Sequence, residues 1–103
     1  MIEIIKEGKL MTVKADASIN AKNVDELRLQ IRNAFEDSIE RIIVDLAATE
    51  SIDSIGLGLL AAVHNSLHQK GSKLELINAK DAICKVLNLM RLDRHFSISC
   101  AVE

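Results

Sequence analysis

The segment "RIIVDLAATESIDSIGLGLL", residues 41–60, passes from branched apolar residues into an apolar stretch that contains two glycines. Residues 41–46 are apolar without alternation, which is typical of a strand covered on both faces. A helix is predicted from Ser54 to about residue 69, and we expect the Ser54 hydroxyl to cap it by accepting a backbone N–H. A buried strand that leads directly into a helix indicates an α/β fold.

The residues before this segment predict a hairpin and a helix. Two short strands surround a turn at residues 7–9. In the second strand, apolar and polar residues alternate as one buried face requires; its apolar members are Met11, Val13, Ala15 and Ala17. A helix follows, with Asn20 as its expected cap and with apolar residues at helical spacing up to residue 35.

The residues after it predict a strand, a third helix and a final strand. The stripe of the long helix ends before Gly71, and a strand occupies residues 73–77. The third helix has an apolar face formed by Ile83, Val86, Leu87 and Met90. The resulting order β-β-α-β-α-β-α-β predicts a mixed sheet, antiparallel in the hairpin and parallel later, with helices mainly on one face.

Length and composition limit the function classes. The chain has 103 residues, of which 49% are apolar and 27% charged, so we expect one globular domain over residues 1–103. The net charge of −2 and the scattered Lys and Arg argue against nucleic-acid binding. No apolar run is long enough to enter a membrane or to act as a secretory signal, so we expect a cytoplasmic protein. Free, buried thiols are expected for Cys84 and Cys100, because a reducing cytosol makes a disulfide the minor alternative.

No enzymatic site is evident. A phosphate-binding loop and a base beside Ser54 are both missing, so we expect neither catalysis nor a bound cofactor. His64 and His68 lie four residues apart, but no carboxylate accompanies them, so we interpret them as solvated helix residues and not as a metal site. His95 is expected at the surface, and Asp45 is expected to bind neighbouring backbone.

The start of the long helix allows two interpretations. From helix physics alone, Ser54 is a capping residue and the glycines ease a tight turn. Gly58, however, lies inside the helix, where glycine costs roughly 1 kcal/mol relative to alanine. It therefore suggests close approach by a neighbouring strand or by a partner protein. The Ser54 hydroxyl is also an accessible target for a kinase, and a phosphate there would be favoured by the helix N-terminus and disfavoured by Asp53.

Two longer segments carry a resemblance to a known family. "IIVDLAATESIDSIGLGLL" and "KGSKLELINAKDAICKVLNLMRLDRHFSI" resemble the STAS domain, in particular the single-domain bacterial anti-sigma factor antagonists. The most specific match is the Asp-Ser/Thr-x-Gly-Leu motif at residues 53–57. Weaker support comes from Leu92 and from the terminal strand at residues 96–98.

The resemblance implies a function for this motif. In the family, an anti-sigma factor that is also a serine kinase phosphorylates the Ser or Thr, and a serine phosphatase removes the phosphate. The resemblance assigns the phosphorylated position to Ser54. It assigns the partner-binding surface to Asn20 and to the segment Asp53, Ser54, Ile55, Gly56, Leu57 and Gly58. The unphosphorylated protein would bind the anti-sigma factor and so free a sigma factor. Which sigma factor or signal is involved, and the oligomeric state, are not indicated.

Two departures from the family pattern leave an alternative open. The family usually has Gly-x-Leu-Asp where this chain has residues 17–20, so Asn20 keeps a capping function but loses the charge. Arg91 precedes Leu92 where the family has glycine, which suggests a different end to the third helix. STAS domains also serve as small subunits of lipid-transport ABC systems, where a similar motif contacts the transporter ATPase. Such a subunit is the alternative function.

Overall fold

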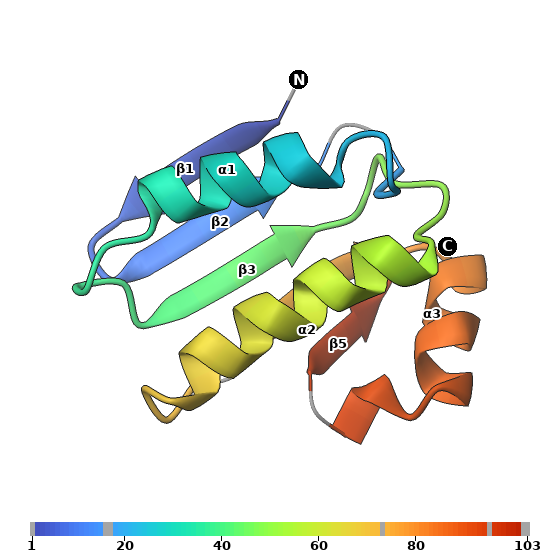
Figure 1. The fold of residues 1–103 in the computed structure, drawn as a ribbon. Helices are drawn as coiled ribbons and strands as arrows, with labels where there is room; N and C mark the ends of the chain where they lie inside the picture. The colour runs from blue at the N-terminus through green and yellow to red at the C-terminus, as the bar shows by residue number, and fades with distance from the viewer. Residues whose placement is uncertain (1, 16–17, 73, 95, 102–103) are drawn as a thin grey trace.

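The computed structural model describes residues 2–15, 18–72, 74–94 and 96–101. The strands form one five-stranded sheet with the order β1-β2-β3-β4-β5, and helices pack against it (Figure 1). The elements follow one another along the chain as β1 (Glu3–Glu7), β2 (Leu10–Lys14), α1 (Val24–Ala34), β3 (Arg41–Asp45), α2 (Ser54–His68), β4 (Leu74–Ala79), α3 (Asp81–Leu89), the 3₁₀ turn η1 (Leu92–Arg94) and β5 (Ser97–Cys100).

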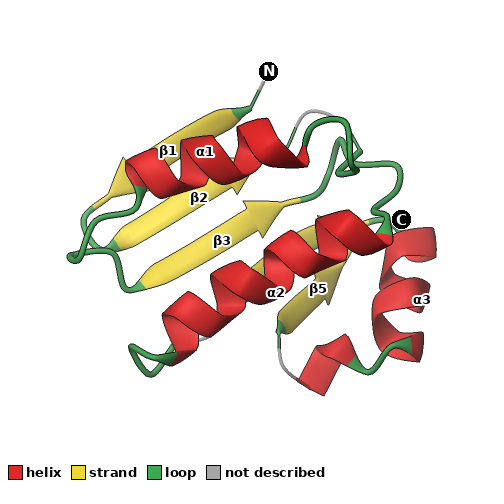
Figure 2. Ribbon diagram, viewed as in Figure 1, coloured by secondary structure: helices red, strands yellow, loops and turns green. Residues whose placement is uncertain are grey.

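The strand pairing confirms the predicted mixed sheet. β1 and β2 are antiparallel, whereas β2, β3, β4 and β5 are mutually parallel. Each parallel strand lies beside the previous one, and connections of this kind are almost always right-handed. Each right-handed connection moves the chain one strand further in the same direction across the sheet, so every connecting helix should lie on the same side of it. Helices α1 and α2 do lie over one face of the sheet (Figure 2).

The core lies between this face and the helices. The inward positions alternate along each strand, as in Met11 and Val13 of β2, Ile42 and Val44 of β3, and Leu74 and Leu76 of β4. The predicted stripe of α2, with Leu59, Leu60, Val63 and Leu67, is buried against them. Full burial of one such side chain contributes roughly 1.5–3 kcal/mol, so this layer supplies most of the driving force for folding.

The prediction that β3 is covered on both faces is wrong. Ile43, which faces away from the helices, is only half-buried. On the same open face, Arg41 forms two hydrogen bonds with the Glu75 carboxylate, at 2.9 and 3.0 Å, and these raise the pKa of its guanidinium. The branched residues of β3 therefore reflect β propensity as well as burial.

Two predictions about helices α1 and α3 need correction. Helix α1 begins at Val24 with Asn23 as its N-cap residue, so Asn20 is not its cap. In α3, Ile83 and Leu87 are buried as predicted, but Val86 and Met90 are 42% and 54% exposed. Cys84 takes the third buried position of α3. The helix is therefore rotated relative to the predicted apolar face, and it presents large apolar side chains to the surface.

The backbone at the end of α3 has a positive φ. Arg91 has a φ of +59°, the left-handed conformation that usually belongs to glycine after a helix. Arg91 therefore ends α3 in a conformation that glycine adopts without strain.

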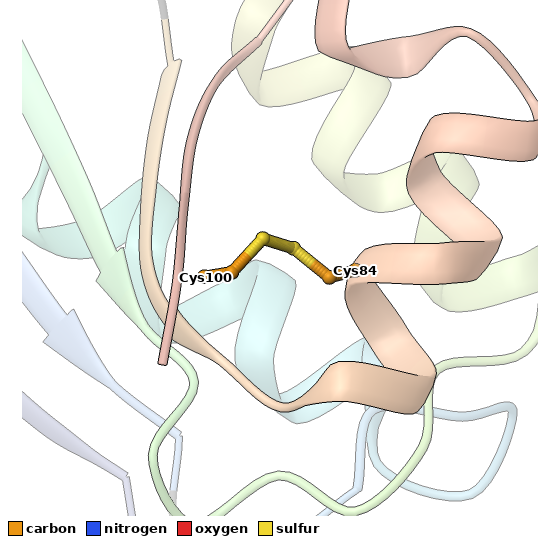
Figure 3. The surroundings of a disulfide bond; sticks show 2 residues. All are labelled: Cys84 and Cys100. Atoms are coloured by element: carbon orange, nitrogen blue, oxygen red, sulfur yellow. A yellow bond between two sulfur atoms is a disulfide. The ribbon is translucent and has the colours of Figure 1, made fainter. Parts of the chain in front are cut away.

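The expectation of two free thiols is wrong as well. Cys84 of α3 and Cys100 of β5 form a disulfide, with their Cα atoms 6.0 Å apart (Figure 3). Sequence spacing could not indicate this pair, because the two residues meet only once α3 has packed beside β5. Within the described residues, no helix has the length and apolar character needed to cross a membrane.

Candidate functional site

Two loops lie side by side at the carboxyl ends of the central strands. One contains residues 18–21 and follows β2, and the other contains residues 51–53 and leads into α2. The Ile19 amide donates to the Ser51 carbonyl at 3.1 Å, and the Asp53 amide donates to the Ile19 carbonyl at 3.1 Å. The Ser51 amide donates to the Ser18 hydroxyl at 3.0 Å. These bonds hold the loops together as a short extra piece of parallel sheet.

Asp53, and not Ser54, caps helix α2, so the predicted cap is displaced by one residue. Its Oδ1 accepts the Gly56 amide at 2.8 Å, and its extended backbone conformation is that of an N-cap residue. Its Oδ2 accepts the amide of Ala21 at 3.1 Å. One carboxylate therefore ends the helix and also fixes the neighbouring loop. Carboxylates at a helix N-terminus are favoured by the helix dipole as well.

Gly56 is the point of closest approach between the loop and the helix. A Cβ atom on this residue would lie 2.6 Å from the Ile19 carbonyl oxygen and 2.9 Å from Ile52 Cγ2. Its role is therefore close packing within the domain and not the easing of a tight turn. Leu57 is also buried, so these two motif residues face inward and support the site from below.

Ser54, Ile55 and Gly58 form the outward side of the same helix turn. Ser54 is the first residue of α2 and is exposed, and none of the side-chain hydrogen bonds within the described residues involves its hydroxyl. Ile55 is 49% exposed. A Cβ on Gly58 would have no neighbour within 4 Å, so no internal strand explains this glycine.

Asn20 lies next to this surface with its side chain engaged locally. Its Oδ1 accepts the Lys22 amide at 2.9 Å, and its own amide donates to Asn23 Oδ1 at 2.9 Å. It thus shapes the turn before α1. The partly buried side chain leaves room for a contact with a partner, although its hydrogen-bonding oxygen is already in use.

A small apolar groove lies on the other side of the helix start, between the residue 50–52 loop, α2 and α3. Its volume is about 120 Å³, and its apolar lining includes Ile52, Leu57, Ile83 and Val86. Glu50 at the rim pairs with Lys80. The exposed residues Leu89 and Met90 extend the apolar surface along α3. The analysis of periodicity missed this surface, because it placed Met90 on the inner face of the helix.

The remaining candidate residues play structural roles. His64 is buried, contrary to the expectation of a solvated residue: its Nδ1 accepts the Leu74 amide at 3.3 Å and its ring lies edge-on to Phe96. His68 is exposed as expected. Asp45 binds the Ala47 amide at 3.0 Å, which confirms its predicted backbone contact. His95 and Ala17 lie outside the described residues.

The described residues contain no group of three His, Cys, Asp or Glu side chains with the geometry of a metal site. At the surface, the N-terminus of α2 carries the Ser54 hydroxyl, which takes part in none of the side-chain hydrogen bonds among the described residues. It lies between the helix face that contains Gly58 and the apolar groove. Such an arrangement fits recognition and covalent modification of the hydroxyl by another protein.

Comparison with known proteins places this geometry in a family. The model of the STAS domain matches residues 1–103. The chain is 26% identical over 91 residues to an anti-sigma-B factor antagonist of Staphylococcus aureus, covering 88% of this chain and 84% of that protein. It is 28% identical over 64 residues to sulfate transporter 3.1 of Arabidopsis thaliana, covering 62% of this chain but only 10% of the transporter.

Solved structures share the fold at lower identity. A protein from Thermotoga maritima superposes with a TM-score of 0.88 at 22% identity, covering 98% of this chain and 87% of that one. The Bacillus cell fate determinant SpoIIAA in its phosphorylated form gives 0.77 at 19% identity, covering 100% of this chain and 93% of that one. Unphosphorylated SpoIIAA, an anti-sigma factor antagonist, gives 0.71 at 18%, covering 91% and 96%.

Proposed function

Because this chain belongs to the STAS domain family over residues 1–103, we propose that it is a phosphorylation-switched binding protein of the anti-sigma factor antagonist type. Unphosphorylated, it binds an anti-sigma factor that is also a serine kinase, and so frees a sigma factor. Phosphorylation of Ser54 releases the partner, and a serine phosphatase restores the binding form. In this proposal it acts in the cytoplasm and catalyses no reaction itself.

The observation that carries the proposal is the position of the Ser54 hydroxyl. It is exposed on the first residue of α2, and the capping task that serine usually performs there is taken by Asp53. The hydroxyl can therefore be modified without loss of a cap. The same residue would otherwise be expected to contribute its oxygen to the helix end.

Electrostatics support a switch that acts on the partner and not on the fold. A phosphate adds about −1.5 to −2 charges at pH 7. The N-terminal amides of α2 favour this charge, whereas the Asp53 carboxylate beside it opposes it. That carboxylate is held by the amides of Gly56 and Ala21, so it cannot easily turn away. The two effects offset each other within the domain, and the added charge is felt by a docked protein.

The surface around Ser54 is suited to docking. Helix α2 contains no Asp, Glu, Lys or Arg between Ser54 and His68. Charged residues are depleted at the centres of protein interfaces, where apolar side chains are desolvated. Ile55 offers an exposed apolar anchor, and the bare backbone at Gly58 lets a partner approach the helix closely. We propose that Asn20, on the adjacent loop, contributes to the rim of this surface.

One observation favours the second candidate, an ABC transporter subunit that binds the ATPase. The family usually has an aspartate at the position of Asn20. An anti-sigma factor docked here would meet a neutral side chain whose oxygen already accepts the Lys22 amide. The same exposed face of α2 would then contact the transporter ATPase.

Copurification distinguishes the two candidates. The tagged protein is expressed in its host, and the proteins retained with it are identified by mass spectrometry. The proposal predicts a serine kinase without its sigma factor, because binding of this protein to the kinase frees the sigma factor. A transporter ATPase in its place would establish the alternative and contradict the main proposal.

Two matched variants locate the contact on the surface. Ile55 in α2 and Leu29 in α1 are both helical apolar residues, 49% and 55% exposed. Ile55→Asp should abolish retention of the partner, because it places a charge at the centre of the proposed interface. Leu29→Asp should retain it. Equal loss from both variants would mean that the partner docks elsewhere or that charge alone disrupts the domain.

A further inference from the structure

The disulfide between Cys84 and Cys100 connects helix α3 with the edge strand β5. Cys84 is buried on the inner side of α3, whereas Cys100 is exposed on β5, the last strand of the sheet (Figure 3). β5 has only four residues and pairs with β4 through an irregular register between Leu76 and Ala79. The Cα separation of 6.0 Å lies within the usual range for a disulfide, so the bond needs no rearrangement of the backbone.

Helix α3 also forms one wall of the apolar groove beside α2. Ile83, directly before Cys84, and Leu87, one turn later, both line that groove. Leu57 of α2, three residues after Ser54, lines it from the other side. The position of α3 therefore sets the shape of a surface that adjoins the proposed phosphorylation site.

We propose that Cys84 and Cys100 form a reversible thiol–disulfide switch that controls how firmly α3 is held, and through it the binding surface. The proposal rests on the proposed function in one respect, because a disulfide in a cytoplasmic protein is usually transient or redox-sensing and not a permanent staple. The ligand class is a small thiol or its disulfide, with glutathione as a representative.

The exchange begins at Cys100, the exposed residue of the pair. A thiolate attacks Cys100 Sγ, the bond between the two protein sulfurs breaks, and Cys84 leaves as a thiolate that takes up a proton. A second thiolate attacks the small molecule's sulfur in the mixed disulfide and releases Cys100. In total, the protein disulfide and two thiols give two protein thiols and one small disulfide. The reverse reaction oxidises the pair.

Oxidation should stiffen α3, and reduction should loosen it. A cross-link between residues separated by 16 positions restricts the unfolded chain, and its reduction should lower Tm by roughly 10–20 °C. Without the bond, α3 is held on its inner side mainly by Ile83 and Leu87. A less ordered groove must be ordered on binding, so the reduced form should bind the partner about fivefold or more weakly.

The test uses the wild-type protein treated with dithiothreitol or with oxidised glutathione. Thiols are counted by alkylation and mass spectrometry, and hydrogen exchange is measured in residues 81–91. The expected result is a full cycle between the two states, with faster exchange in α3 after reduction. The variant Cys84→Ala/Cys100→Ala is the control, since its exchange should not respond to dithiothreitol. If it fails to fold, Cys100→Ser serves instead.

Rapid acid quenching and alkylation in the host then report the state in cells. A disulfide fraction that rises on oxidant treatment supports the switch. Cysteines that stay fully reduced, or fully oxidised, under both conditions would overturn it, as would α3 exchange that is identical in the two states. Equal partner affinity of both forms would overturn the link to binding. The thiol state and the hydrogen exchange of α3 are measured without a partner, so a failure to find any anti-sigma factor or ATPase would count against the proposed function and not against the thiol exchange.

Discussion

Gly56 and Gly58 lie two residues apart in one helix turn, and alanine at the two positions should change stability in opposite directions. In Gly56→Ala, the new methyl group would lie 2.6 Å from the Ile19 carbonyl oxygen and 2.8 Å from Ile19 Cγ2. That carbonyl accepts the Asp53 amide, so it cannot move away without loss of a hydrogen bond. In Gly58→Ala, the methyl group enters open space.

The magnitudes follow from two opposing effects. Alanine gains about 1 kcal/mol over glycine inside a helix, so Gly58→Ala should raise the free energy of unfolding by that amount. Overpacking typically costs about 1–3 kcal/mol, and the rigid backbone neighbour at Gly56 favours the upper end. After the helix gain is subtracted, Gly56→Ala should lower the free energy of unfolding by about 2 kcal/mol.

Urea unfolding of the wild type and the two variants measures both values. For a domain of this size, Tm should rise by about 4–8 °C in Gly58→Ala and fall by about 8–16 °C in Gly56→Ala. Equal stability of the two variants would refute the assignment of Gly56 to internal packing. A destabilised Gly58→Ala would show that Gly58 also packs within the domain, which would remove an argument for docking. If Gly58→Ala is stabilised as expected, Gly58→Leu should weaken partner binding more than it changes stability.

Two further predictions concern backbone groups at helix ends. Asp53→Ala should lower the free energy of unfolding by about 2 kcal/mol in urea unfolding, because the amides of Gly56 and Ala21 lose their acceptor; an unchanged value would contradict the capping role. Arg91→Gly should raise it by about 1 kcal/mol, since Arg91 has a φ of +59°, whereas Gly71→Ala, at +80°, should lower it by a similar amount. Changes of the same sign at these two positions would contradict the argument from φ.

Local patterns predicted most of the fold. The hairpin turn, the order of strands and helices, and the length of α2 all follow from features within a few residues of each other, such as alternation in β2 and the stop at Gly71. The right-handed connection rule then gave the side of the sheet on which the helices lie. The burial of α3 was less predictable, because four large apolar residues in a helix of nine residues leave its inner face ambiguous.

The features that the sequence could not predict depend on contacts between distant segments. The disulfide requires α3 to pack beside β5, and the burial of His64 depends on the Leu74 amide and the Phe96 ring. The motif at residues 53–57 led to the proposed site, of which the structure places Ser54 and Ile55 at the surface. The motif did not indicate which of its residues caps the helix. Asp53 is the cap, because its carboxylate accepts amides from both the helix and the 18–21 loop.

The most direct test of the proposed switch compares the affinity of the copurified kinase for the protein before and after phosphorylation. Site mapping after incubation with the kinase and ATP should place the phosphate on Ser54, and Ser54→Ala should take up none while binding as tightly as the wild type. The phosphorylated protein and Ser54→Asp should bind more than about a hundredfold more weakly, which corresponds to a loss of about 3 kcal/mol. If Ser54→Asp binds as tightly as Ser54→Ala, or if phosphate still enters Ser54→Ala, Ser54 is not the switch.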